Sequence, residues 1–151
     1  MAGRHGIASI EDLATGTAIR TMIQLIAHAN CAIRITEISI GFTGTTNTGV
    51  PIKVRLLRQT TGGTMDALTP VKADDSVADA LATTAQKGKE SGGAEPTAGD
   101  VLRSWAVHPQ TSQILPISDV APLIVGVGDR VGLEVLAAAD VDCDAAIQFE
   151  E

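Results

Sequence analysis

The sequence predicts an all-β protein with a jelly-roll-like architecture, in which two sheets pack as a β-sandwich. Apolar residues alternate with polar residues in several short runs, and Gly, Asn and Pro residues typical of turns separate these runs. The chain has three aromatic residues and no tyrosine, so β-branched and other aliphatic side chains must fill the core. Its 151 residues suit one domain with a single core.

Residues 1–16 are expected to be an extended N-terminal arm outside a single sandwich domain that spans residues 17–151. The arm has little apolar periodicity and contains Gly3, Gly6 and Gly16. Terminal segments of this kind are usually ordered only where they lie on another surface. The arm also lacks the apolar segment of a secretory signal, and no run in the chain approaches the ~20 apolar residues of a membrane helix. We therefore expect no membrane association.

The first strand of the domain is predicted within residues 17–28. Its apolar residues recur with the spacing of a half-buried strand. We expect Ile19, Ile23, Leu25 and Ile26 to point toward the core, which makes this segment one of the central strands of the sandwich.

The clearest strand signals lie within residues 32–58, which predict a pair of strands joined at residues 44–51 by Gly, Asn and Pro. The alternation in the first strand shifts by one residue at Thr36 and Glu37, which indicates a β-bulge. The second strand alternates regularly over residues 52–56. Strand pairs of this kind build sandwiches and barrels.

A long, partly irregular insertion is predicted over residues 60–100, where the alternation stops and no aromatic residue occurs. A structureless loop of that length is unusual inside a compact domain, so the insertion must hold a short element or pack on a neighbour. One candidate element is a helix over residues 76–87, with Asp75 or Ser76 as its N-cap. Its apolar stripe would consist of Val77, Ala80, Leu81 and Ala85.

Strand signals return after residue 100 and continue to the last residues. Turn-forming glycines and aspartates separate five runs with alternating or continuous apolar residues. The predicted strands are residues 101–108, 113–117, 122–127, 130–136 and 142–149. Together with the earlier strands they number about eight, as in a two-sheet jelly roll.

The two cysteines, Cys31 and Cys143, are expected to be free thiols. Both lie in strand-like runs far apart in the sequence. Two cysteines do not constitute a disulfide framework, and a cysteine in a strand commonly acts as a small buried apolar residue. A disulfide between them is the alternative, if their strands are neighbours.

The charge distribution argues against nucleic-acid binding. The net charge is −7, and residues 1–60 hold six basic and three acidic side chains, so the acidic excess lies in the remainder. Contacts with phosphates would require the opposite balance. An acidic surface that favours solubility explains the charge, whereas a basic face that docks on an acidic partner is the alternative. The expected partner-contact residues are Arg4, Lys53, Arg55, Arg58 and Trp105.

Trp105 itself has two interpretations. A core plug or a subunit-contact anchor is favoured over a stacking platform for a nucleobase, because no second aromatic residue flanks it and its surroundings are not basic.

No motif in the chain indicates catalysis. His5, His28 and His108 lack the short spacing that zinc and iron sites need. Nucleophile-elbow and Walker motifs are absent, and the glycines at residues 126–128 lack the rest of a dinucleotide fingerprint. We therefore expect no enzymatic activity, no metal and no cofactor.

An acidic run near the C-terminus has two interpretations. Asp140, Asp142 and Asp144 have the spacing of the start of a calcium-binding loop. Counted from Asp140, the twelfth position holds the expected glutamate, Glu151, but the glycine expected at the sixth position is replaced by Ala145. The favoured interpretation is a solvent-facing edge of the last strand, which produces the same alternation without an ion.

Several segments with β-sheet character follow one another in a suggestive order over most of residues 17–151. They are residues 35–58, 61–75, 104–110, 125–135 and 149–151. In this order the chain resembles the jelly-roll capsid decoration, or cement, proteins of tailed bacteriophages. The resemblance carries over no individual functional residue.

This resemblance implies a structural virion protein that binds the outer surface of the major capsid protein lattice and stabilises it. It also implies a homotrimer or another symmetric assembly, without a cofactor, that forms in the host cytoplasm and lies on the capsid exterior. The net negative charge of the chain agrees with a location away from packaged DNA, which is also negatively charged.

Two alternatives to a decoration protein remain. One is another virion component, such as a head-fibre base or a tail protein. The other is a carbohydrate-binding jelly-roll module, although sugar platforms usually present exposed aromatic rings, and this chain has one tryptophan and no tyrosine.

Overall fold

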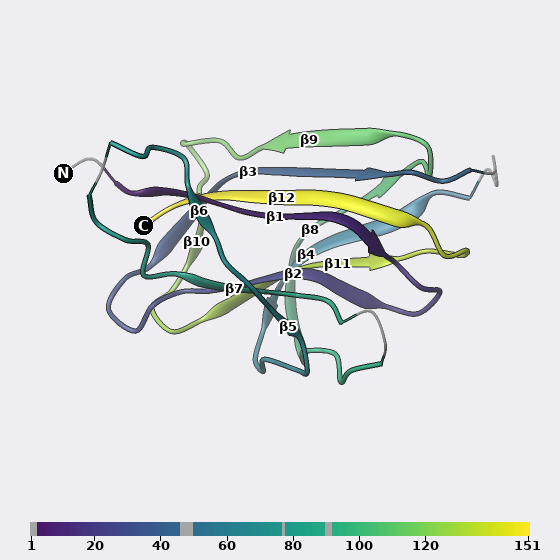
Figure 1. Cartoon of the computed structure of the whole chain (residues 1–151), viewed down its shortest axis with the longest axis horizontal. Helices are drawn as coiled ribbons and strands as arrows, with labels where there is room; N and C mark the ends of the chain where they lie inside the picture. Colours follow the sequence, from purple (N-terminus) through teal and green to yellow (C-terminus); the bar gives the residue numbers. More distant parts are fainter. Residues whose placement is uncertain (1–2, 46–49, 77, 90–91) are drawn as a thin grey trace.

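The described part of the chain folds as a two-layer sandwich built entirely from strands (Figure 1). The computed structural model describes residues 3–45, 50–76, 78–89 and 92–151. Within these residues, twelve strands form two six-stranded sheets with antiparallel pairing throughout, and no helix occurs. The predicted all-β class and two-sheet arrangement are therefore confirmed.

Sheet A holds the first and last strands of the chain side by side at its centre. The order is β10–β3–β12–β1–β6, and β9 follows β10 along the same edge of β3. The strands are β1 (His5–Ala14), β3 (Ile33–Phe42), β6 (Val71–Lys72), β9 (Ser112–Pro116), β10 (Leu123–Val125) and β12 (Asp142–Glu150).

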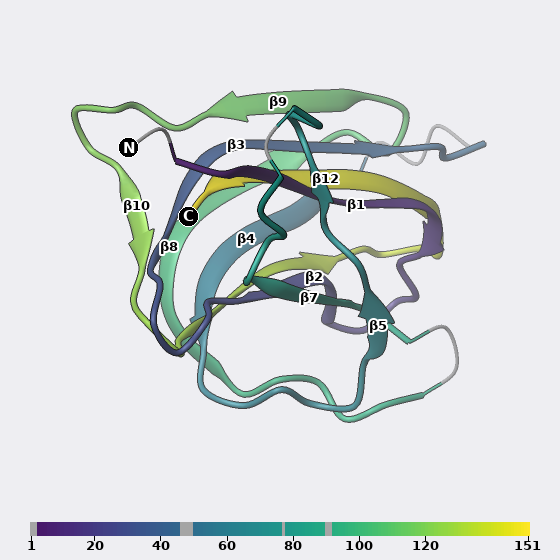
Figure 2. The same ribbon diagram turned by 60° about the vertical axis from the view of Figure 1, so that its left-hand side comes forward.

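Sheet B forms the second layer, in the order β5–β7–β2–β11–β4–β8. Its strands are β2 (Arg20–Ile26), β4 (Ile52–Gln59), β5 (Asp66–Leu68), β7 (Thr84–Lys87), β8 (Ala98–Val107) and β11 (Arg130–Leu136). In Figure 2 this layer lies below sheet A, and strand β8 is at its edge.

Aliphatic side chains from both sheets fill the space between the layers. Each strand directs alternate residues inward, where they meet residues from the facing sheet. The largest fully buried side chains include Phe149, Met22, Ile23, Leu25, Ile38 and Leu133. Two phenylalanine rings, Phe149 and Phe42, lie among aliphatic neighbours in the described core.

The N-terminal segment contributes a central strand, so the prediction of a separate arm is wrong. Strand β1 pairs with β12 over most of its length and with β6 near its start. Ala8, Ile10 and Leu13 are buried between the sheets. A register shift between Ile10 and Leu13 interrupts the alternation, and this bulge conceals the strand in the sequence.

Strand β2 is central, as expected, but its inward-facing set differs from the prediction. Ile23 and Leu25 are buried and Ile26 is half-buried, whereas Ile19 precedes the strand and is 45% exposed. The buried positions of β2 are consecutive because the inserted segment covers its outer face while the core covers the inner one. Alternation is therefore weak in this strand.

The strands β3 and β4 form no pair, which corrects the prediction for residues 32–58. Strand β3 pairs with β12, β9 and β10 in sheet A, whereas β4 pairs with β11 and β8 in sheet B. The connection between them crosses from one layer to the other, and residues 46–49 of it lie outside the described residues. Alternation specifies which face of a strand is buried but leaves its partner undetermined.

The predicted β-bulge in β3 is confirmed. Glu37 pairs with Gln148 and Ile35 pairs with Phe149, so Thr36 has no counterpart on β12. One extra residue on β3 explains the phase shift in the sequence.

The inserted segment contains short strands and packs on its own domain. We name its described residues 60–76, 78–89 and 92–97 the strap. The helix predicted over residues 76–87 is wrong, because the end of this stretch forms β7, which pairs with β2. Backbone groups on the edge of β2 are satisfied in this way, and that pairing outweighs a weak helical pattern. Val77, part of the predicted stripe, lies outside the described residues.

Both cysteines are free thiols in this structure. Cys143 is buried opposite Phe42 at one end of β3, whereas Cys31 lies in a loop just before Ile33 at the other end. The length of β3 places the two sulfur atoms about 30 Å apart. An intrachain disulfide is therefore excluded, and the expectation that Cys31 lies in a strand is wrong.

We predict that a thiol reagent labels Cys31 in the native protein and leaves Cys143 unmodified. Burial, with a smaller contribution from the charge of Asp144, raises the pKa of Cys143 to about 12, so its reactive thiolate is scarce at neutral pH. Mass spectrometry after labelling would measure one adduct in the native state and two in urea. Two adducts formed at similar rates without denaturant would contradict the prediction.

Candidate functional site

The five residues expected to contact a partner do not form one basic face. Arg4 forms an ion pair with Glu151 at 3.1 Å. On sheet B, the Arg55 Nε donates to Glu134 Oε1 at 2.9 Å, and Arg58 donates to a backbone carbonyl group at 3.3 Å. Carboxylates from strands distant in sequence therefore neutralise two of the four expected cations.

The other two expected contact residues lie on sheet B and differ in exposure. Lys53 is exposed on the outer face, in register with Ala106 on β8 and Leu136 on β11. Trp105 is half-buried and packs against the core, and its indole Nε1 is buried without a hydrogen-bond partner. The core-plug interpretation thus describes the position of Trp105 in this chain.

The outer face of sheet A is open and carries small side chains at its centre. Ser9, Ala146, Ser39 and Ile114 form one row across four neighbouring strands, β1, β12, β3 and β9. Ser9 is exposed and Ile114 is 64% exposed. Because three of these four side chains are small, the face is hollowed, with a volume of about 790 Å³.

Carboxylates lie at one end of this hollow. They belong to Glu11, Asp12 and Asp144, whereas the residues that line the hollow include no lysine or arginine. Asp12 has a positive φ of 50° within the bulge of β1, and its N–H donates to Asp144 Oδ1 at 2.8 Å. Asp144 therefore holds the bulge in a conformation that few residues other than glycine adopt.

Two carboxylates of the acidic run, Asp140 and Asp144, accept backbone N–H groups. Asp140 Oδ1 accepts the N–H of Gly16 at 2.7 Å, as Asp144 does for Asp12. In the described ranges, no three or more histidine, cysteine, aspartate or glutamate side chains converge as metal ligands would.

We predict that dialysis against a chelator leaves the thermal unfolding midpoint unchanged. The Asp140 and Asp144 side chains have backbone partners, so we expect their positions not to depend on a bound cation. Differential scanning calorimetry before and after dialysis would measure this. A fall of several degrees, reversed by added calcium, would show that the run binds the ion after all.

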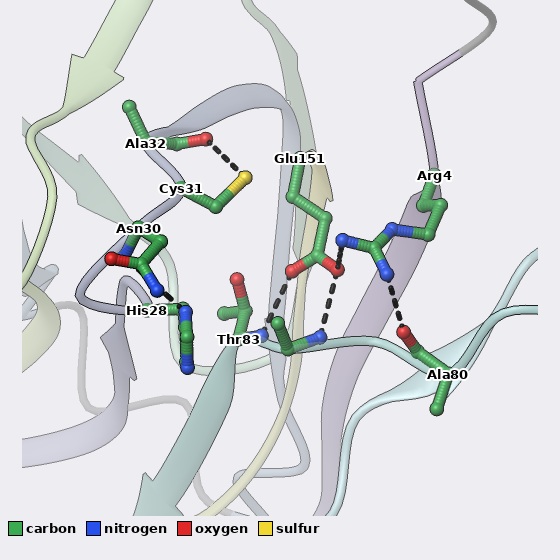
Figure 3. Close-up of polar contacts among 9 residues, drawn as sticks. Arg4, His28, Asn30, Cys31, Ala32, Ala80, Thr83 and Glu151 are labelled. Atoms are coloured by element: carbon green, nitrogen blue, oxygen red, sulfur yellow. Dashed lines mark hydrogen bonds and ion pairs between the residues drawn. The ribbon is translucent and has the colours of Figure 1, made fainter.

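A second polar cluster joins the start of β1 and the end of β12 to the strap (Figure 3). The Glu151 carboxylate accepts the backbone N–H groups of Ala82 and Thr83, both at 2.8 Å, and it faces Arg4. Burial alone would raise the pKa of Glu151, but the bonds from Thr83 and Ala82 and the charge of Arg4 together hold that pKa below its ordinary value.

Figure 3 also shows the loop that contains His28 and Cys31. The N–H of Asn30 donates to the imidazole Nδ1 of His28 at 3.3 Å, and the Cys31 thiol donates to the carbonyl oxygen of Ala32 at 3.4 Å. Both contacts join near neighbours in the chain, so they shape the loop and assemble no reactive pair.

Large apolar side chains are also exposed along one margin of sheet A. They lie on β9, on β10 and in the adjoining turns, namely Ile114, Val120, Ile124 and Val127. This apolar strip follows an edge of the sheet beside which the described part of the chain places no further strand.

Comparisons with known proteins identify no relative from which a function could be transferred. No family model, curated protein or solved structure matches this chain. The described residues include no helix with the length and apolar character needed to span a membrane.

The residues of the open face were not among the predicted contact residues. A signal for them exists in the sequence, since Ser39, Asp144 and Ala146 alternate with buried apolar residues in their strands and so must face outward. That signal does not distinguish a face that another segment covers from one that stays open. Only the tertiary arrangement provides this distinction.

Proposed function

We propose that this protein is a structural virion subunit, a decoration or cement protein that binds the outer surface of the major capsid protein lattice of a tailed phage and stabilises it. The observation that carries this proposal is the open outer face of sheet A. Small side chains across four strands let another protein approach the sheet closely over a broad area.

The two faces of the sandwich support a division of roles. Strap residues cover part of the outer face of sheet B, where Thr61 and Glu95 bond to Gln24 and Thr21 of β2. Within the described residues, the outer face of sheet A has no comparable cover, and Ser9 and Ile114 remain exposed. Sheet A is thus the face that can lie on a shell, while the covered face points away.

A symmetric assembly, a homotrimer in the first instance, forms part of this proposal. Edge strands offer unpaired backbone groups, and β8 and β9 both lie at sheet edges. The exposed apolar strip lies at the edge that includes β9, where a neighbouring copy would remove it from water. Light scattering of the purified protein tests this point, and a monomer at all concentrations would contradict it.

The proposal is tested by adding the protein to capsids that lack it. Matched variants Ser9→Trp and Ser104→Trp each place a bulky ring at an exposed serine on a strand, the first on sheet A and the second on sheet B. We expect Ser9→Trp to weaken binding about tenfold or more, because the ring fills the hollow. Ser104→Trp should bind like the unmodified protein.

Cryo-electron microscopy of the particles would measure site occupancy and position. Failure of the unmodified protein to bind shells would contradict a decoration role. Density at the tail or at a fibre base would favour another virion component. Equal binding by both variants would mean that sheet A is not the docking face.

Carbohydrate binding is a second candidate, because the hollow on sheet A presents serine hydroxyl groups beside carboxylates. The aromatic residue that lines the hollow, Phe42, is buried and offers no ring for sugar stacking. Glycan-array binding that Ser9→Trp abolishes would favour this candidate over the decoration role.

A further inference from the structure

A single buried carboxylate fastens the strap to both ends of the described chain. The Glu151 side chain is 0% exposed and accepts the N–H groups of Ala82 and Thr83 at 2.8 Å. Arg4 reaches the same carboxylate and also donates to the carbonyl oxygen of Ala80 at 2.7 Å. In Figure 3 these side chains converge on one short stretch of the strap. We name this group of contacts the clasp.

The strap covers a polar surface rather than an apolar one. On the outer face of sheet B, Gln24 Nε2 donates to Gln59 Oε1 at 2.7 Å and to the carbonyl oxygen of Thr61 at 3.1 Å. The backbone N–H of Thr21 donates to a carboxylate oxygen of Glu95 at 2.7 Å. Water can replace hydrogen bonds of this kind, whereas it cannot replace the burial of apolar side chains.

The strap contributes little to the hydrophobic core. Ala85 is its buried apolar contribution, and Leu68 and Leu81 pack on the core while partly exposed. Segments with few buried apolar contacts open more readily than the core strands they lie on. Polar contacts therefore hold much of the strap in place, and the clasp is the part of them that contains a buried carboxylate.

We propose that the strap is a releasable cover latched by Glu151, and that protonation of this carboxylate lets residues 80–87 leave β2 while the two sheets stay folded. Release would uncover the β2 edge from Ile23 to Ile26, which is now paired with β7. An uncovered edge is a surface on which another strand can pair.

The direction of the pH dependence follows from the contacts of Glu151. Its pKa is lowered in the folded protein from an ordinary value of 4.5, so the clasp stabilises the closed strap above that value. The stabilisation is lost as the pH falls through the lower, folded-state pKa. The clasp is thus closed near neutral pH and opens in acid.

Other charged groups lie on the elements that surround the clasp. On the neighbouring strands, Glu150 pairs with Arg34. Further charged or titratable residues on the adjoining elements include His5, Lys72, Asp75, Asp79 and Lys87. Asp74 also has a lowered pKa, caused mainly by bonds from Ser76, two residues away on the strap itself. Asp74 therefore provides a matched acidic control that fastens no second element.

Hydrogen exchange of the full chain, followed by mass spectrometry and corrected for intrinsic rates, tests the proposal. In the unmodified protein, residues 80–87 should be protected at pH 7 and lose protection in acid while β11 and β4 keep theirs. Glu151→Gln should exchange roughly tenfold faster at residues 80–87 already at pH 7, with little further change in acid. Asp74→Asn should behave like the unmodified protein.

A second variant tests the role of the charge. Arg4→Met leaves the carboxylate buried without its cation, so opening should begin at a higher pH than in the unmodified protein. The proposal is overturned if Glu151→Gln leaves the exchange of residues 80–87 unchanged at both pH values. It is equally overturned if β11 and β4 lose protection together with the strap, since opening would then be global unfolding.

Discussion

Replacing Arg55 with glutamate should lower the free energy of unfolding by about 3 kcal/mol. Glu134, on the neighbouring strand β11, is only 4% exposed, and two nitrogen atoms of the Arg55 guanidinium contact its carboxylate. The substitution would leave this carboxylate without its cation and place a second negative charge beside it. Urea denaturation followed by circular dichroism would measure the loss.

Lys53→Glu is the matched control for this charge reversal. Lys53 lies two residues earlier on the same face of β4 and is exposed, so its reversal should change the free energy of unfolding by about 0.5 kcal/mol or less. The double variant Arg55→Glu with Glu134→Arg should recover part of the lost stability. Equal effects of Arg55→Glu and Lys53→Glu would show that the ion pair does not stabilise the fold.

Phe149→Ala should cost about 3–5 kcal/mol, because it removes an aromatic ring from the centre of the core. Phe149 is 0% exposed and pairs with Gly6 on β1 and Ile35 on β3. A β-carbon at Gly6 would lie 2.4 Å from the Phe149 ring, so the ring occupies space that only glycine leaves free. The resulting cavity should not close without movement of β1.

Ile114→Ala provides the comparison for the Phe149 substitution. Ile114 is 64% exposed on the open face, and its truncation should change the unfolding midpoint in urea very little. Thermal and urea denaturation of both variants would measure the difference. Similar losses in the two variants would mean that Phe149 is not a central packing residue.

The fold class was predictable because alternation is a local property. Ile33–Phe42 and Ile52–Gln59 each show in sequence the period that buries one face of a strand, and both are strands in the structure. The bulge at Thr36 was visible for the same reason, as a shift of that period.

Strand partners were not predictable, because pairing depends on residues far apart in the chain. β3 and β4 are neighbours in sequence but belong to different sheets, and nothing in their alternation distinguishes these arrangements. β1 is hard to detect because its bulge and its small residues weaken the pattern. β7 is hard to detect because its four residues gain order from the edge of β2.

The contact residues illustrate a related limit. Arg4 and Arg55 are cations in the sequence, but each meets a carboxylate supplied by a distant strand or chain segment. A surplus of basic residues in one stretch therefore did not predict a basic surface. Whether the outer face of sheet A stays open depends on the path that the strap takes. The residues of sheet A do not determine that path.

The pairing of β1 with β12 also determines when the sandwich can form during synthesis. β1 leaves the ribosome before the other described strands, yet Ala8, Ile10 and Leu13 find their sheet partner only after residues 142–150 have been made. Such high contact order implies slow folding. Until residues 142–150 have been made, this early apolar strand has only its short pairing with β6, a state in which chaperones or aggregation compete for it. The same pairing brings His5 beside Glu150, so a short linker could join the two ends in a circular permutant.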